Sequence, residues 1–141
     1  MPRFSNASKK RLKDVHPLLR DILQFAVRFV DFTVLVGFRD KEQQDKEFAE
    51  GDSKVRWPNS KHNKVPAEAV DIAPYPIDWS NRERFYYVSG FVMGAGSAML
   101  YFLGLDKKLK LRFGGDWDQD GEIADNKFDD IGHIELVRNQ D

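Results

Sequence analysis

The residues of this chain that could do chemistry together are two histidines and a few carboxylates. His62 and His133 are two of only three histidines, and each has a carboxylate nearby, Asp71 after the first and Asp130 before the second. Two imidazoles and one carboxylate are what a catalytic zinc site takes from a protein, and a fourth position stays open for water. A further carboxylate could accept a proton from that water. The sequence therefore predicts a zinc hydrolase with His62, Asp71 and His133 as ligands.

The composition limits which kinds of protein could carry such a site. At 141 residues, 41% of them hydrophobic, the chain is long enough to bury a core. Its 22 basic and 23 acidic residues nearly cancel, so no overall charge favours nucleic-acid binding. Cysteine is absent, so a metal must be held by nitrogen and oxygen. Residues 1–14 lack the apolar stretch of a secretory signal, and we expect a protein that either works in the cytoplasm or is released by another route.

His62 and Asp71 lie far from His133 in the sequence, so the three residues can share one metal only if the fold brings them together. Apolar spacing predicts two helical pieces within residues 8–30, with Ser8 as an N-cap and Pro17 in the first turn of the second piece. Asp40 is expected to cap a short charged helix over 41–50. Strands are expected over 32–38, 68–73, 109–113 and 132–137, and loops over 52–66 and 114–130. We predict a single α+β domain over residues 1–141, a small antiparallel sheet packed against helices with the zinc site in a cleft.

The uncharged run over residues 85–105 is, by length alone, sufficient to cross a bilayer, and it contains Gly90 and Gly94. A membrane span would separate His62 from His133, and no shared metal site could form. We therefore predict no membrane insertion, but a central helix that starts near residue 78 or 80 and is packed on all sides. Its small residues would allow a sheet to approach closely.

Longer motifs connect these blocks with a known family. The motifs are Gly-Phe-Arg at 37–39, Ser-Lys-His at 60–62, Asp-Ile-Ala-Pro at 71–74, Leu-Arg-Phe-Gly-Gly-Asp-Trp at 111–117 and Asp-Ile-Gly-His-Ile-Glu at 130–135. In this order they resemble the M15 family of zinc peptidases, which includes D-alanyl-D-alanine carboxypeptidases and dipeptidases. The likeness is closest to the branch of L-alanyl-D-glutamate peptidases that serve as phage endolysins.

The resemblance implies roles for single residues. His62, Asp71 and His133 would bind zinc, Asp130 would be the catalytic carboxylate, and Arg39 would stabilise the charge that develops on the scissile carbonyl oxygen. The implied reaction is hydrolysis of the L-alanyl-D-glutamate bond in the peptidoglycan stem peptide. A monomeric endolysin of this kind would stay in the host cytoplasm until its release to the cell wall. The alternatives are D-alanyl-D-alanine cleavage and a non-catalytic cell-wall-binding metal protein.

The chain departs from the family pattern in two places. The family usually reads Ser-x-His-x-x-Gly-x-Ala-x-Asp, whereas this chain has two more residues between His62 and Asp71 and no glycine there. We expect residues 63–66 to loop out, which costs little entropy. Many members have glutamate in place of Asp130. Glu135 shares a strand face with the second histidine by period-two alternation, so it could orient that ligand or act as the base instead.

Each of these residues also has a plain structural interpretation. His62 alone could be an ordinary loop histidine and His133 alone a hydrogen-bonded core residue; their occurrence together with the other motifs favours the metal site. Arg39 could form no more than a surface ion pair with the adjacent Asp40. Ser60 could hold the turn, contact substrate, or both.

A second acidic segment resembles the opening of a calcium-binding EF-hand loop. Asp116, Asp118 and Asp120 occupy its first, third and fifth positions, and Gly121 its sixth. The twelfth position is Lys127 instead of a bidentate glutamate. The sequence therefore leaves two interpretations open, a Ca²⁺ site and a solvated acidic turn at the rim of the cleft.

Overall fold

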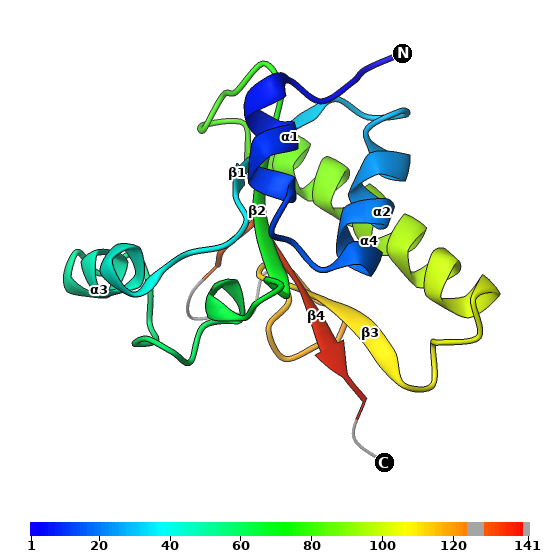
Figure 1. Cartoon of the computed structure of the whole chain (residues 1–141). Coiled ribbons are helices and arrows are strands. Elements are labelled where there is room, and N and C mark those ends of the chain that lie inside the picture. The colour runs from blue at the N-terminus through cyan, green and yellow to red at the C-terminus, as the bar shows by residue number, and fades with distance from the viewer. Residues whose placement is uncertain (124–128, 140–141) are drawn as a thin grey trace.

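The computed structural model of the chain describes residues 1–123 and 129–139, and a four-stranded antiparallel sheet lies at its centre (Figure 1). The strands are β1 (Phe32–Val36), β2 (Ala69–Pro74), β3 (Leu109–Phe113) and β4 (His133–Arg138), in the order β1-β2-β4-β3. Because β4 pairs directly with β2, the register places Asp71 opposite His133, 62 residues later in the sequence. The sheet itself therefore joins the two blocks.

Helices cover one face of this sheet. The elements are α1 (Asn6–Leu12), α2 (Pro17–Ala26) and α4 (Arg82–Phe102), with α3 (Lys41–Ala49) standing to one side and a short 3₁₀ helix, η1 (Lys61–Asn63), preceding β2 (Figure 1). Helix α2 packs on α4, and α4 in turn contacts β2 and β3. All three covering helices contribute to one hydrophobic core. The predicted α+β architecture, an antiparallel sheet packed against helices, is confirmed.

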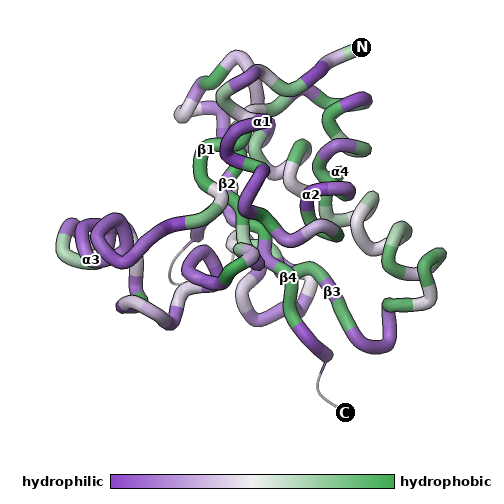
Figure 2. Tube along the Cα trace, in the orientation of Figure 1, coloured by the Kyte–Doolittle hydropathy of each residue, from purple (hydrophilic) through white to green (hydrophobic). Residues whose placement is uncertain are grey.

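Alternation along the strands separates an apolar face from a polar one. Side chains on the apolar face enter the core; from β2, β3 and β4 these are Val70, Ile72, Leu111, Phe113, Ile134 and Leu136. The intervening residues Asp71, Arg112, His133 and Glu135 share the opposite face. Along the chain, hydrophobic residues gather in the strands at the centre, whereas α3 is hydrophilic (Figure 2). A row of polar side chains thus crosses three neighbouring strands.

Several element ends agree with the sequence prediction, whereas the start of α1, the end of β1 at Val36 and the start of α4 do not. Pro17 is the first residue of α2, as predicted. The N-cap of α1 is Ser5 and not Ser8, which is buried inside the helix. The Ser8 hydroxyl instead accepts a hydrogen bond of 3.0 Å from the Val34 backbone N–H, which joins α1 to β1. Helix α4 begins at Arg82, later than predicted.

Helix α4 is not packed on all sides as expected, since Phe102 is 83% exposed. The predicted close approach of the sheet to a small residue is present, although Gly90 and Gly94 face open space. The glycine that is needed is Gly96, where an added Cβ would lie 2.2 Å from the Leu111 Cδ1 atom of β3. Within residues 1–123 and 129–139, no helix combines the length and apolarity required to cross a membrane.

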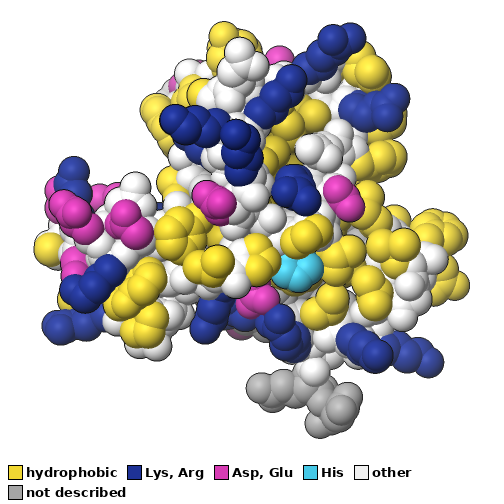
Figure 3. All heavy atoms as spheres, in the orientation of Figure 1, with side chains coloured by type: hydrophobic (Ala, Val, Ile, Leu, Met, Phe, Trp, Pro, Cys, Tyr) yellow, Lys and Arg dark blue, Asp and Glu magenta, His cyan; other side chains and the backbone are white. Residues whose placement is uncertain are grey.

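Charge is unevenly distributed over the surface although the net charge is nearly zero. Basic side chains gather over α1 (Figure 3), which carries Lys9, Lys10 and Arg11 in its last turn. None of these three residues lines the cleft described below. The basic surface and the polar row of the sheet are therefore separate features of the molecule.

Candidate metal centre

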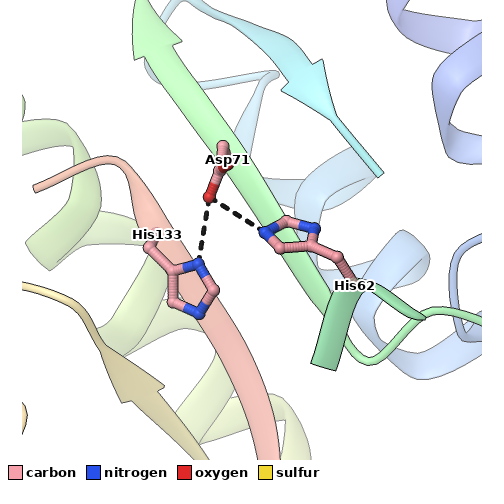
Figure 4. Close-up of side chains that lie close together, drawn as sticks. All are labelled: His62, Asp71 and His133. Carbon is pink, nitrogen blue, oxygen red and sulfur yellow. Dashed lines mark hydrogen bonds and ion pairs between the residues drawn. The ribbon is translucent and has the colours of Figure 1, made fainter. Parts of the chain in front are cut away.

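Two histidine side chains from different elements converge on one carboxylate oxygen of a third element (Figure 4). The Oδ1 atom of Asp71 on β2 lies 3.2 Å from His62 Nε2 and 3.0 Å from His133 Nδ1. One ligand atom from each residue lies within 4.8 Å of the other two. Both histidines are buried. The structure thus brings together the three residues that the sequence singled out as metal ligands.

The ring nitrogens that face away from Asp71 indicate which atoms of the two histidines are available for a metal. His62 Nδ1 lies 2.8 Å from the Gly37 carbonyl oxygen, and His133 Nε2 lies 2.8 Å from Glu135 Oε1. A carbonyl and an ionised carboxylate only accept hydrogen bonds, so both outward nitrogens carry hydrogen. In neutral rings the inner nitrogens then present lone pairs to Asp71, which is also an acceptor. Three acceptors facing one another require a cation or a proton between them, so this donor set fits a divalent metal.

Without a metal, protons take the place of the cation. Burial lowers the pKa of His133, but hydrogen bonds to Asp71 and Glu135, together with the charges of Asp71 and Asp130, raise it to about 10. Burial also works against ionisation of Asp71, yet the charges and hydrogen bonds of the two histidines hold the pKa of this carboxyl far below its usual range. The site is therefore built to concentrate positive charge.

The turn that presents His62 is capped by its own side chains. Ser60 Oγ accepts a hydrogen bond of 3.2 Å from the His62 backbone N–H, and Asn63 Oδ1 accepts one of 3.0 Å from the Ser60 N–H. The predicted loop-out over 63–66 is correct for residues 64–66, which are exposed, but Asn63 is buried. Asp71 still reaches His62, since its Oδ1 atom lies 3.2 Å from His62 Nε2.

Arg39 lies against the site instead of pairing with Asp40. Its Nη2 atom is 3.5 Å from Asp71 Oδ2, and its Nη1 atom donates a 3.0 Å hydrogen bond to Gln44 Oε1. The Asp40 carboxylate caps α3. Gln44 is completely buried, and its amide nitrogen donates to the Val55 carbonyl oxygen at 2.8 Å. Sequence reasoning missed Gln44 because a glutamine within a charged helix gives no sign of burial.

Asp130 and Glu135 occupy opposite sides of the His133 ring. Asp130 Oδ2 lies 3.9 Å from Nδ1, the nitrogen that faces Asp71, and its side chain is 38% exposed. Burial and the charge of Asp71 raise the pKa of Asp130. Glu135 contacts the other ring nitrogen, Nε2, and is itself buried. Of the two carboxylates, Asp130 is the one placed beside the metal ligands on the open side.

The centre opens into a cleft of about 840 Å³. Residues that line it besides the three candidate ligands include Arg39, Lys61, Trp79, Arg112, Trp117 and Asp130. The ring centroid of Trp117 is 5.2 Å from that of His133. Aromatic, basic and acidic groups therefore surround the centre and could orient a bound ligand.

Comparison with known proteins decides the family. The sequence profile of the phage L-alanyl-D-glutamate peptidases matches residues 1–137. The chain belongs to this family. It is 34% identical over 143 residues to the L-alanyl-D-glutamate peptidase of Escherichia phage T5, covering 96% of this chain and 98% of the phage T5 protein. The resemblance inferred from the motifs is confirmed.

A solved structure supports the fold of this family member. The chain is similar to the L-Ala D-Glu endopeptidase ChiX of Serratia marcescens, with a TM-score of 0.67 and 24% sequence identity. The match covers 96% of this chain and 90% of ChiX. At this level of identity the likeness concerns the arrangement of helices and strands.

The acidic loop of the peptidase family member forms a second group of carboxylates. Oxygen atoms of Asp116, Asp118 and Asp120 lie within 4.8 Å of one another. The Asp116 carboxylate accepts a 3.0 Å hydrogen bond from the N–H of Gly121, whose φ of 85° is one that glycine adopts readily. Lys127, the twelfth position of the EF-hand comparison, lies outside the described residues. A calcium site here remains a prediction.

Proposed function

We propose that this phage L-alanyl-D-glutamate peptidase family member is a zinc-dependent endolysin that hydrolyses the L-alanyl-D-glutamate bond of peptidoglycan stem peptides. The observation that carries the proposal is the convergence of His62 Nε2 and His133 Nδ1 on Asp71, with both outward ring nitrogens held by acceptors. The named activity of the phage T5 relative supports the choice of bond.

Zinc is the metal that this set of ligands favours. Two imidazole nitrogens and one carboxylate oxygen form a catalytic zinc site in several unrelated hydrolases, and a chain without cysteine has no thiolate to offer. A bound zinc ion would polarise the scissile carbonyl and lower the pKa of a water molecule to about 7. His62, Asp71 and His133 would hold the ion, and Glu135 would orient His133 through Nε2.

Two side chains at the open side would carry out the chemistry. Asp130 would accept the proton of the attacking water and pass it to the leaving amine, a task that its raised pKa favours. Arg39, held between Asp71 and Gln44, would face the negative charge that develops on the carbonyl oxygen. The Ser60 hydroxyl accepts the hydrogen bond that caps the turn of His62, and we assign it a role in positioning that ligand.

Mass spectrometry of digested peptidoglycan, combined with metal analysis, tests the proposal. The protein should hold about one zinc per chain, lose activity with a chelator and release peptides with a new N-terminal D-glutamate. The Asp130→Ala variant should keep zinc and lose hydrolysis by roughly 10²-fold or more. Release of D-alanine would indicate D-alanyl-D-alanine cleavage instead. Wall binding that persists in the variant, without any hydrolysis by the wild type, would indicate a non-catalytic binding protein.

We also propose that Asp116, Asp118 and Asp120 bind Ca²⁺ beside the cleft. Three carboxylates in close proximity and a glycine at the sixth position support this assignment. Calorimetry with the zinc-loaded protein should show heat on addition of calcium, and Asp118→Asn should weaken it. A wild-type titration without heat would leave the solvated acidic turn as the explanation.

The proposed role also concerns the cellular location and the oligomeric state of the enzyme. We infer that the enzyme acts as a monomer on the cell wall after release from the host cytoplasm, since kinship with phage peptidases suits an enzyme that acts during lysis. Light scattering during gel filtration should give a mass close to 16.3 kDa. A mass of twice that value at micromolar concentration would contradict the monomer.

A further inference from the structure

Arg112 stands on the polar face of the sheet, one strand beyond the candidate metal ligands. It lies on β3 opposite Glu135 of β4, in the row of side chains that contains Asp71 and His133. Its Nε atom donates a 2.8 Å hydrogen bond to the Trp117 carbonyl oxygen, and its guanidinium carbon lies 4.9 Å from the centroid of the Trp117 ring. Two contacts thus hold the guanidinium plane in a defined orientation.

The terminal nitrogens of Arg112 keep donors available for a ligand. Nη1 lies 3.9 Å from Glu135 Oε2, which is an ion pair but too long for a hydrogen bond. The other Glu135 oxygen already accepts from His133 at 2.8 Å. Among the residues that the structure describes, no acceptor takes a hydrogen bond from these terminal nitrogens. The side chain is 33% exposed and lines the cleft.

Two other cations of the cleft are already engaged. Arg39 contacts Asp71 and Gln44, and Lys61 lies 3.5 Å from Glu68. Arg112 differs because a single carboxylate, that of Glu135, separates its guanidinium from the ring of a candidate metal ligand. An anionic group bound by Arg112 would therefore belong to a substrate residue at or next to the scissile bond.

The substrate supplies such a group at that position. A glutamyl residue has two carboxyl groups, and whichever of them continues the peptide, the other stays free and ionised. If it is the carboxyl on the α-carbon, it lies about 4 Å from the attacked carbonyl carbon, through one nitrogen and one carbon. We propose that Arg112 binds this free carboxylate of the D-glutamyl residue and so determines specificity for it. The inference rests on the proposed function and names the partner of one side chain in the same site.

Two synthetic stem peptides test the assignment, one with the free D-glutamyl carboxylate and one with that group as a carboxamide. The zinc-loaded wild type should cleave the carboxylate peptide with a kcat/KM about 10- to 100-fold higher, as a charge-assisted bidentate pair requires. The Arg112→Gln variant should bring the two values to within about 3-fold, mainly through KM. Arg112→Lys keeps the charge but not the planar fork, and should give an intermediate ratio.

Lys110→Gln is the matched control, because Lys110 stands two positions earlier on the same strand face, is exposed and does not line the cleft. It should keep the wild-type ratio. A wild type that cleaves both peptides equally overturns the inference. So does an Arg112→Gln variant that slows both reactions by the same factor, since this would show that Arg112 only supports Glu135. A wild type that cleaves neither peptide overturns the proposed function itself, a result that is distinct from these two.

Discussion

Zinc binding to the metal-free protein should release at least one proton per ion at pH 7. Burial lowers the pKa of His133, but Asp71 at 3.0 Å from Nδ1 and Glu135 at 2.8 Å from Nε2 raise it to about 10. The ring of the metal-free protein is therefore protonated on both nitrogens at neutral pH. A metal needs the lone pair of Nδ1, so the proton on Nδ1 must leave, whereas the one on Nε2 stays with Glu135.

The size of the effect follows from the pKa. The difference of about 3 units between pH 7 and a pKa of about 10 corresponds to roughly 4 kcal/mol of competition between the proton and the metal. The apparent zinc affinity should therefore rise about tenfold for each pH unit between pH 6.5 and 8.5.

Isothermal titration calorimetry in buffers of different ionisation enthalpy measures the released proton directly. At pH 7, the slope of the observed enthalpy against the buffer enthalpy should correspond to at least one proton. The His16→Asn variant, which removes the remaining histidine and leaves a good N-cap for α2, should give the same slope. A slope near zero together with a pH-independent affinity would refute the reasoning, since His133 would then be neutral in the metal-free site.

Three further predictions concern stability and affinity. The pKa of His133 is higher in the folded protein than its unfolded value of about 6.5. The stability that His133 contributes is therefore complete below pH 6.5 and is lost as the pH rises through about 10. The melting temperature of the metal-free protein should fall across this range, and that of the zinc-loaded protein should fall less. Glu135→Gln should weaken zinc binding by about 10- to 100-fold in a competitive chelator titration, whereas Glu68→Gln, which removes another buried carboxylate, should not. In urea denaturation, Gly96→Ala should lower the free energy of unfolding by about 1–3 kcal/mol, because the added methyl group clashes with β3. Gly90→Ala lies in open space on the same helix and should raise the free energy of unfolding by up to about 1 kcal/mol. Equal effects of the two substitutions would contradict the packing assigned to α4.

Features set by a few neighbouring residues could be predicted from the sequence. Pro17 begins α2 and Asp40 caps α3 because ring geometry and side-chain capping act within one turn of helix. The strands of the sheet followed from β-branched residues and period-two alternation, and the same alternation correctly placed Glu135 beside His133. The motifs around His62 and His133 also led to the family, because residue types in a fixed order need no coordinates to be compared.

The tertiary structure alone decided which atoms face one another. The pairing of β2 with β4 puts Asp71 opposite His133 across 62 residues, and no local rule gives the order of strands in a sheet. The tertiary structure also buries Gln44, although the sequence of its helix predicts a solvent-exposed helix. The packing around Arg39, and not the helix itself, excludes water there. The sequence determines which side chains are available for chemistry. The distances between them in the site depend on long-range packing, in which many weak contacts act together.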